Sequence, residues 1–253
     1  MKKNSNCKTS KSLKTKKGNN SIKKKKIIYN NYELNSLEFK EALLLDKRGF
    51  CGYYSFLIKT KNIILFSFWP IKDYNSMIIK TCIFSLSFSI HYIINFAFFD
   101  YKILHKIYEI GGKYDFMLFF SKILISFGIA YIITIIIKLI FLSERNISKI
   151  RMQSTFNLAS KYSYQAKKHL VIKYIIFFIF GLIFLVFLWM LLSAFGAVYQ
   201  NTQIIIFQNA LISFTISLIY PFFFSIIPSI FRITSLKSKS EYAYKFSKFL
   251  QIL

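Results

Sequence analysis

The sequence carries no charged residue over 58 consecutive positions, 174–231, between Lys173 and Arg232. A single helix of that length would measure about 87 Å, whereas each crossing of a bilayer core about 30 Å thick needs about 20 residues. The run must therefore cross the membrane, turn and cross back. It predicts two transmembrane helices, 174–195 and 204–231, joined by an uncharged turn.

Two earlier apolar stretches, 77–99 and 116–142, are also long enough to span, and the charges of the connections predict the threading. The connection 100–115 has three basic and three acidic residues, whereas 143–173 has seven basic residues and one acidic residue. Positive charge collects on the cytoplasmic side of multi-pass proteins. We predict an all-α membrane protein with four transmembrane helices and both termini cytoplasmic, in a plasma membrane or endomembrane that the pattern does not distinguish.

The two terminal regions are polar and basic. Residues 1–32 contain eleven lysines and no acid, which predicts a disordered basic cytoplasmic tail. Such a tail is attracted to anionic lipids of the cytoplasmic leaflet, although a solvated tail without a specific role fits equally well. Residues 232–253, with five basic residues and one acidic residue, predict a short basic cytoplasmic tail.

Residues 33–76 predict an interfacial region of one or two amphipathic helices. Asn35 followed by Glu38 resembles a capping box at a helix start. The apolar stretch 50–69 is interrupted near its centre by two lysines, which would be costly in the middle of a bilayer. We expect this stretch in the membrane interface, and a re-entrant path stays open as the alternative.

Three lysines and two prolines lie inside the predicted spans. Lys80 and Lys138 are within about a turn of the inner face and Lys122 is within about two turns of the outer one, so each side chain can extend to the headgroups. Pro221 and Pro228 each remove a backbone N–H from the fourth span and predict a kink there.

Small and polar residues at helical spacing predict which faces of the spans pack, because apolar surface gains nothing from apolar contact in lipid. Residues four apart share one helical face. The packing stripes are Ser87 with His91 and Asn95 in the first span, Ser126, Ala130 and Thr134 in the second, and Asn209, Ser213 and Ser217 in the fourth. The third span has no such stripe and is predicted to face lipid.

Polar residues of several spans are predicted to meet in the outer third of the bundle. The cluster comprises His91, Asn95, Ser193, Gln208 and Asn209, with Lys122 at similar depth. At 1.5 Å per residue, Asn95, Gln208 and Asn209 lie about 6 to 8 Å below the outer face. The hypothesis is that the cluster lines an outward-facing cavity or binding site, and the alternative is that it forms hydrogen-bonded packing contacts.

The sequence offers no catalytic or metal-binding motif. All 10 Asp and Glu residues lie outside the predicted spans, and there is no paired nucleophile and base, zinc motif or phosphate-binding glycine loop. Cys7, Cys51 and Cys82 have neither metal-ligand nor disulfide spacing and are predicted to be free thiols. We therefore predict no enzymatic activity, no cofactor, no metal and no nucleic-acid partner.

The segments LEFKEALLLDKR, IKLIFLSERNI and FGAVYQNTQ resemble those of an uncharacterised group of protist multi-pass membrane proteins, and the likeness covers residues 34–253. In that group the module often ends much longer chains. The resemblance implies a shared architecture and tilts the expected function toward a membrane anchor or assembly unit. The alternative is a small channel or transporter, which would require oligomerisation because four helices enclose little space.

Overall fold

The computed structural model describes residues 29–71, 73–151, 155–199 and 202–252. Within these ranges the regular elements are all helices and there is no strand, which confirms the all-α prediction. The helices are α1 (Asn31–Ser36), α2 (Phe39–Leu45), α3 (Phe50–Lys61), α4 (Ile63–Phe68), α5 (Met77–Ala97), α6 (Tyr101–Glu109), α7 (Phe116–Phe141), α8 (Glu144–Arg151), α9 (Phe156–Val198), α10 (Gln203–Phe224), α11 (Ile226–Ser238) and α12 (Glu241–Ile252).

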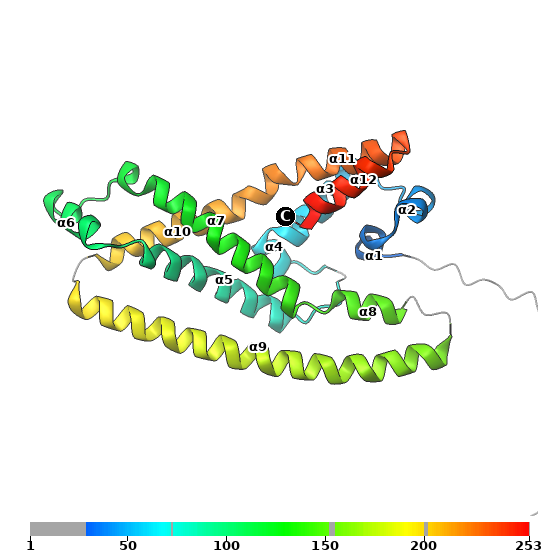
Figure 1. The fold of residues 1–253 in the computed structure, drawn as a ribbon, viewed down its shortest axis with the longest axis horizontal. Helices are drawn as coiled ribbons and strands as arrows, with labels where there is room; N and C mark the ends of the chain where they lie inside the picture. The colour runs from blue at the N-terminus through cyan, green and yellow to red at the C-terminus, as the bar shows by residue number, and fades with distance from the viewer. Residues whose placement is uncertain (1–28, 72, 152–154, 200–201, 253) are drawn as a thin grey trace, which may run out of the picture.

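Four helical segments of the described chain are long and apolar enough to cross a membrane, which confirms the multi-pass prediction. They are α5, α7, α9 and the successive helices α10 and α11. Helices α5, α7 and α10 pack on one another, and α9 runs along one side of them (Figure 1). The connection 98–115 lies at one end of the bundle, hereafter the outer end. Helices α1 and α12 lie toward the opposite, inner end, and both names follow the predicted orientation.

The first two spans begin at the predicted residues and end close to the predicted limits. Helix α5 starts at Met77 and α7 at Phe116. Asp115 caps α7, and its Oδ1 accepts a hydrogen bond from the Met117 backbone N–H at 2.9 Å. An acidic cap satisfies a free N–H of the first turn and favours the positive end of the helix dipole.

The third span is longer than predicted. Helix α9 begins at Phe156 rather than at residue 174, because the lysine-bearing segment before the apolar run has no proline or glycine to end a helix. Lys173 Nζ donates to the Leu142 carbonyl oxygen at 2.8 Å, so Lys173 lies level with the inner end of α7. Residues 156–172, named the α9 extension, therefore reach about 25 Å beyond that level.

The fourth span is interrupted at Ser225. Helix α10 ends at Phe224 and α11 begins at Ile226. The break follows from Pro228, which has no N–H to donate to the Phe224 carbonyl four residues earlier. Pro221, the other predicted kink site, lies inside α10. The break separates the part of the span that packs in the bundle from the part that continues to the inner end.

The C-terminal residues 232–253, predicted as a tail, are helical as far as the structure describes them. Helix α11 continues to Ser238, Lys239 turns the chain with a φ of 54°, and α12 folds back along α11. Tyr244 and Ser247 of α12 are buried. The charges indicated a tail, but the segment also has one face that can pack on α11.

The first N-terminal helix begins at an earlier Asn-x-x-Glu motif than the predicted one. Asn30, rather than Asn35, caps the first helix, and its backbone N–H donates to Glu33 Oε2 at 2.8 Å in a capping box. Both sites have the Asn-x-x-Glu spacing. The Asn35 side chain instead accepts from Arg48 Nη2 at 2.6 Å. Spacing alone could not separate the two sites, because the choice depends on this tertiary partner.

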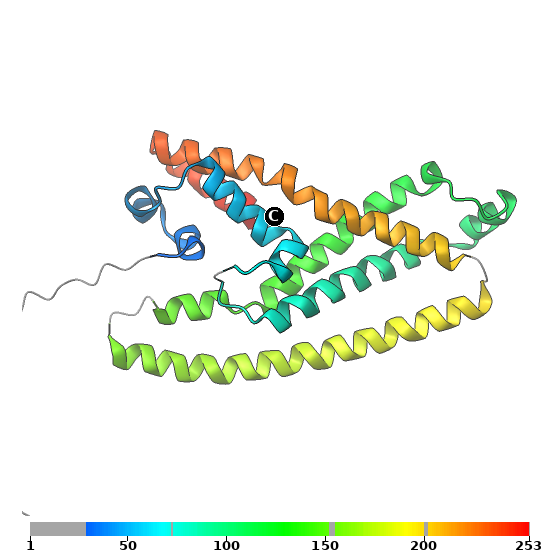
Figure 2. The same ribbon diagram turned by 180° about the vertical axis from the view of Figure 1, so that it is seen from behind.

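Helices α3 and α4 form a corner, named the wedge (50–68), that reaches into the bundle from the inner end beside α11 (Figure 2). Asn62 at the corner accepts from the Ile64 N–H at 3.1 Å and donates to the Leu218 carbonyl oxygen at 2.8 Å. Leu218 is about 22 Å along α10 from its outer start. The corner therefore lies beside the inner half of α10, a geometry that matches the re-entrant alternative.

Candidate functional site

Three of the predicted outer polar residues are buried and hydrogen-bonded. His91 Nδ1 lies 2.8 Å from Ser213 Oγ, which joins α5 to α10. Asn95 Nδ2 donates to the His91 carbonyl oxygen at 2.8 Å within α5. Asn209 Oδ1 accepts from the Tyr114 hydroxyl at 2.7 Å. The bonds of His91 and Asn209 therefore join separate elements of the outer half of the bundle, whereas the bond of Asn95 stays within α5.

A cavity of about 630 Å³ lies at the outer end. It is lined by Ile107, Tyr108, Gly111, Gly112, Tyr114, Thr202, Ile204, Ile205 and Gln208. Gly111 and Gly112 end α6 with φ values of 63° and 72°, a backbone conformation that favours glycine. Tyr114 lines the cavity and also binds Asn209, so it stands between the cavity and the buried polar residues.

Two buried polar atoms in the outer half of the bundle have no hydrogen-bond partner among the described residues. They are His91 Nε2 and Ser126 Oγ. At 1.5 Å per residue, His91 lies about 9 Å and Ser126 about 15 Å from the outer ends of their helices. Buried polar atoms normally bind another protein group or an ordered water. The outer half of the bundle thus has hydrogen-bonding capacity left for a small polar molecule.

The other predicted members of the outer cluster lie apart from these contacts. Ser193 is exposed on α9, and Gln208 is half-buried in the cavity wall. Lys122 is half-buried on α7. Sequence reasoning missed Tyr114, and the available signal was a tyrosine directly before the helix cap Asp115 at the outer face.

The predicted packing stripes lie in the interior between α5, α7 and α10. Ser87 Oγ and Thr134 Oγ1 are 3.2 Å apart, which joins α5 to α7. The other stripe residues, Ser126, Ala130, Ser213 and Ser217, are buried. Small side chains let helices approach closely, and hydrogen bonds between them replace the hydrophobic driving force that lipid removes.

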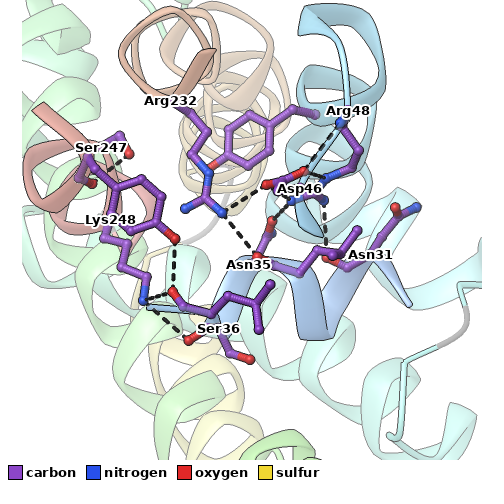
Figure 3. Close-up of polar contacts among 12 residues, drawn as sticks. Asn31, Asn35, Ser36, Asp46, Arg48, Arg232, Ser247 and Lys248 are labelled. Carbon is purple, nitrogen blue, oxygen red and sulfur yellow. Dashed lines mark hydrogen bonds and ion pairs between the residues drawn. The ribbon is translucent and has the colours of Figure 1, made fainter. Parts of the chain in front are cut away.

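A second polar centre, absent from the sequence-based prediction, joins the two ends of the chain at the inner end (Figure 3). Asp46 lies between two arginines. Arg48 donates to it through Nε at 2.7 Å and Nη2 at 2.8 Å, and Arg232 of α11 donates through Nη2 at 2.9 Å. Arg232 Nη2 also donates to the Leu34 carbonyl oxygen at 3.0 Å. We name Asn35, Asp46, Arg48 and Arg232 the Asp46 network.

Aromatic rings enclose Arg232, whose side chain is 0% exposed. Its guanidinium carbon lies 4.2 Å from the ring centroid of Tyr244 and 5.6 Å from that of Tyr53, which are cation–π distances. The Tyr244 hydroxyl donates to the Leu37 carbonyl oxygen at 2.8 Å, and Lys248 Nζ donates to the same oxygen at 2.6 Å. Helices α11 and α12 are thereby tied to the segment between α1 and α2.

The surroundings of this network determine its ionisation. Burial opposes the charged form of Asp46, but the hydrogen bonds and charges of Arg48 and Arg232 outweigh it and hold the pKa of Asp46 below its ordinary value of 3.8. Burial raises the pKa of Tyr53 to about 12. At neutral pH the network therefore contains one carboxylate between two guanidinium groups, beside a neutral tyrosine.

Further ion pairs tie the inner ends of the helices together. Lys80 Nζ lies 2.6 Å from Asp73 Oδ1, and the two side chains are 1% and 3% exposed. The prediction that Lys80 extends to the headgroups is therefore wrong, because the connection before α5 brings it a carboxylate. Glu33 Oε1 accepts from the Tyr74 hydroxyl at 2.8 Å and lies 3.4 Å from Arg151 Nε, which ties α1 to α8.

Comparison of the chain with protein-family models, with curated proteins and with solved structures found no match. The resemblance to protist multi-pass proteins therefore stays a prediction. Among the residues that the structure describes, no group of three or more His, Cys, Asp or Glu is placed to hold a metal ion. Cys51 is exposed and Cys82 is half-buried, and both are free thiols. Cys7 and the predicted basic tail up to residue 28 lie outside the described residues.

Proposed function

We propose that this protein is a non-enzymatic membrane anchor or assembly unit whose inner end binds a partner protein. The four apolar helical segments provide the membrane attachment. The Asp46 network and the bonds of Tyr244 hold α1, α2, α11 and α12 together as one unit, named the inner cap. Because the cap combines both terminal regions, it offers a partner a preformed surface rather than two loose segments.

Exposed aromatic residues at the inner end carry this proposal. Phe156 and Tyr164 of the α9 extension are 85% and 79% exposed, and Tyr242 of α12 is 84% exposed. Phe156 lies about 25 Å beyond the inner end of α7, whereas the headgroup layer adds only about 5 to 8 Å to each side of the hydrocarbon core. Lipid chains do not extend to that distance. Contact with a partner protein is the way to cover such rings that fits best.

The inner side also carries the basic charge. Lys161, Lys167 and Lys168 are exposed on the α9 extension, beside its aromatic residues. We propose that this side faces the cytoplasm, that the basic tail is attracted to anionic lipids, and that the partner surface is acidic. The partner can be a second copy of the chain or a different protein.

The test is the mass of the protein purified in mild detergent from its native membrane. The unmodified chain is expected in a complex larger than the monomer. Replacing Phe156 and Tyr164 together by alanine should release the monomer, because it removes two exposed rings from the interface. Replacing Phe178 and Phe187 by alanine is the matched control, since both are about half exposed on the same helix within the apolar span.

The control variant should keep the complex. A monomeric unmodified protein, or a complex lost equally in both double variants, would contradict a partner site on the α9 extension. Mass spectrometry of the complex then distinguishes a second copy of the chain from another protein.

A small oligomeric channel or transporter is the second candidate function, and the outer cavity supports it. Tyr114 lines this cavity of about 630 Å³ and donates to Asn209. Asn209 lies one turn of α10 from Ser213, the partner of His91 Nδ1. If a solute passes this way, Tyr114→Phe should change flux into reconstituted vesicles several-fold while leaving the fold intact. Tyr108→Phe, on the cavity wall, is the matched control. Flux equal to that of empty vesicles would exclude this candidate.

The proposed orientation has a direct test. In a chain with its native cysteines replaced by serine, a new cysteine at the exposed Lys113 of the outer end should react with an impermeant thiol reagent added outside the cell. A chain retaining only the exposed Cys51 should react after permeabilisation. The reverse pattern would overturn the orientation.

A further inference from the structure

Two lysines from different elements meet beside the wedge, level with the inner ends of the spans. Lys138 Nζ of α7 donates to the Lys61 carbonyl oxygen at 3.4 Å, and Lys61 Nζ of α3 donates to the Leu250 carbonyl oxygen at 3.1 Å. Both side chains are half-buried. Lys138 lies about 5 Å before the last residue of α7. The pair is therefore close to the level at which headgroups of the inner leaflet begin.

The protein compensates these two charges only in part. Lys138 Nζ lies 4.8 Å from the ring centroid of Phe66, and Lys61 Nζ lies 4.9 Å from that of Phe224. Ring faces and carbonyl oxygens attract a cation but do not neutralise it. Two ammonium groups in a poorly solvated place repel each other unless an anion lies between or beside them.

Carboxylates of the inner end do not supply that anion. Asp46, Asp73 and Glu33 each pair with another basic residue. Within the described part of the chain, no ion pair joins Lys61 or Lys138 to an acid. The unbalanced positive charge therefore points to a ligand from outside the chain.

Exposed apolar side chains on α4 and α7, the helix beside Lys138 and the helix that carries it, indicate what that ligand is. Ile64 and Phe68 of α4 are 40% and 52% exposed, and Ile140 of α7 is 54% exposed. A phosphate group beside the two ammonium groups, attached to acyl chains that cover these side chains, satisfies both features. Basic pockets between spans on the cytoplasmic side bind anionic headgroups in this way. We propose that Lys61 and Lys138 form a binding site for the phosphate of an anionic phospholipid of the inner leaflet.

This lipid site is independent of the partner surface on the α9 extension. It also differs from attraction of the basic tail, because it requires two particular lysines in a fixed place. A buried site is screened by salt less than a solvated tail is. Binding at Lys61 and Lys138 should therefore persist at a salt concentration that abolishes tail binding.

Trp69 provides the reporter for the test, since it is half exposed and directly follows α4, whose Phe66 contacts Lys138. The full chain with Trp189→Phe is reconstituted in phosphatidylcholine vesicles, and brominated phosphatidylserine or brominated phosphatidylcholine is titrated in at high salt. Bromine quenches tryptophan fluorescence on contact. The serine lipid is expected to quench Trp69 at a much lower mole fraction than the choline lipid.

The Lys61→Gln and Lys138→Gln double variant should lose this preference by about 30-fold, since each lysine near the surface contributes about a fivefold factor. Lys122→Gln is the matched control, because Lys122 is a half-buried lysine at the opposite end of the bundle. Equal quenching by the two lipids in the unmodified chain, or full preference in the double variant, would overturn the proposal.

Two further arms complete the test. Millimolar inorganic phosphate should leave the quenching unchanged, whereas displacement of the lipid by phosphate would identify a free-anion site and overturn the lipid assignment. If the double glutamine variant does not fold, Lys138→Gln alone should lower the preference about fivefold and Lys138→Arg should retain it. A Lys138→Gln chain with undiminished preference would also contradict the site.

Discussion

Residues 174–198 of α9 and all of α10 come from the same charge-free run, yet the two helices pack very differently. Among the described residues of α9, only Phe177 is buried. Helix α10 is about half as long and buries eight residues, including Asn209, Ser213 and Ser217. The difference lies in the small and polar stripe of α10, because apolar surface alone gives two helices no reason to associate in lipid. Apolar length thus determines where a helix lies, and the stripe determines what it contacts.

The contrast continues beyond the spans at the inner end. Helix α10 passes into α11, where Arg232 is fully buried against Asp46 and Tyr244. Helix α9 instead begins with an extension that exposes Phe156 and Tyr164. Helix α10 and its continuation α11 therefore lead into the inner cap, whereas α9 leaves a surface that we propose to be covered by a partner.

The largest expected effect concerns the buried charges on the α11 side. Asp46→Ala should lower the free energy of unfolding by about 3 to 5 kcal/mol, because it leaves Arg232 buried without its counter-charge. Lys167→Ala on the exposed α9 extension should change it by less than about 0.5 kcal/mol. Chemical or thermal unfolding in detergent measures both. Equal changes in the free energy of unfolding would contradict the contrast between α11 and the α9 extension.

Acid should weaken the contact between Asp46 and Arg232 by protonating the Asp46 carboxylate. The pKa of Asp46 is lower in the folded state than its ordinary value of 3.8, so its contribution to stability is complete above the ordinary value and is lost as the pH falls through the folded value. The unfolding temperature should therefore fall more steeply below about pH 4 in the unmodified chain than in Asp46→Asn. Parallel pH profiles of the two proteins would contradict this role.

Larger side chains should destabilise α10 more than α9 within the spans. Ala210→Leu on α10 adds volume to a fully buried position and should cost about 1 to 3 kcal/mol. Val186→Leu on α9, at a position that is 62% exposed, should have an effect within about 0.5 kcal/mol. Unfolding temperatures of the two variants provide the comparison, and a destabilised α9 variant would show that α9 packs more tightly than described.

The smallest expected effect concerns the hydrogen bond between α5 and α10. Ser213→Ala removes the partner of His91 Nδ1 and should cost about 0.6 kcal/mol, the average for such bonds between membrane helices. Thr215→Ala is the control, since its hydroxyl is exposed and bonds only to Leu211 of its own helix. A loss near 3 kcal/mol would mean that His91 has no other way to satisfy its ring nitrogen.

The sequence predicts the spans well because their limits depend on local composition. Asp115 precedes α7 directly, as a helix cap should, and the small residues of α10 lie on the buried face. The start of α9 could not be found in this way, since polar residues without proline or glycine continue a helix as readily as they end one.

The inner cap escaped prediction for a different reason. Arg232 ends the charge-free run and Asp46 lies in an amphipathic segment, and each residue alone is typical of a solvated boundary. Their pairing depends on a contact between the two ends of the chain. Lys80 was likewise expected at the headgroups, because its partner Asp73 lies in a connection whose path the sequence does not give. Local patterns predict exposure, whereas buried ion pairs require the fold.

The difference in packing between α9 and α10 can be measured most directly with spin labels in reconstituted membranes. The labels are placed one at a time along α9 (176–190) and α10 (205–219). Accessibility to oxygen, which dissolves in lipid, reports the lipid-facing positions. We expect deep accessibility minima along α10 at Asn209, Ser213 and Ser217, which are buried. Along α9 we expect one deep minimum at Phe177 and only shallow minima at the half-buried positions 181, 184 and 188. Minima equally deep in both helices, or the absence of minima from α10, would contradict the contrast.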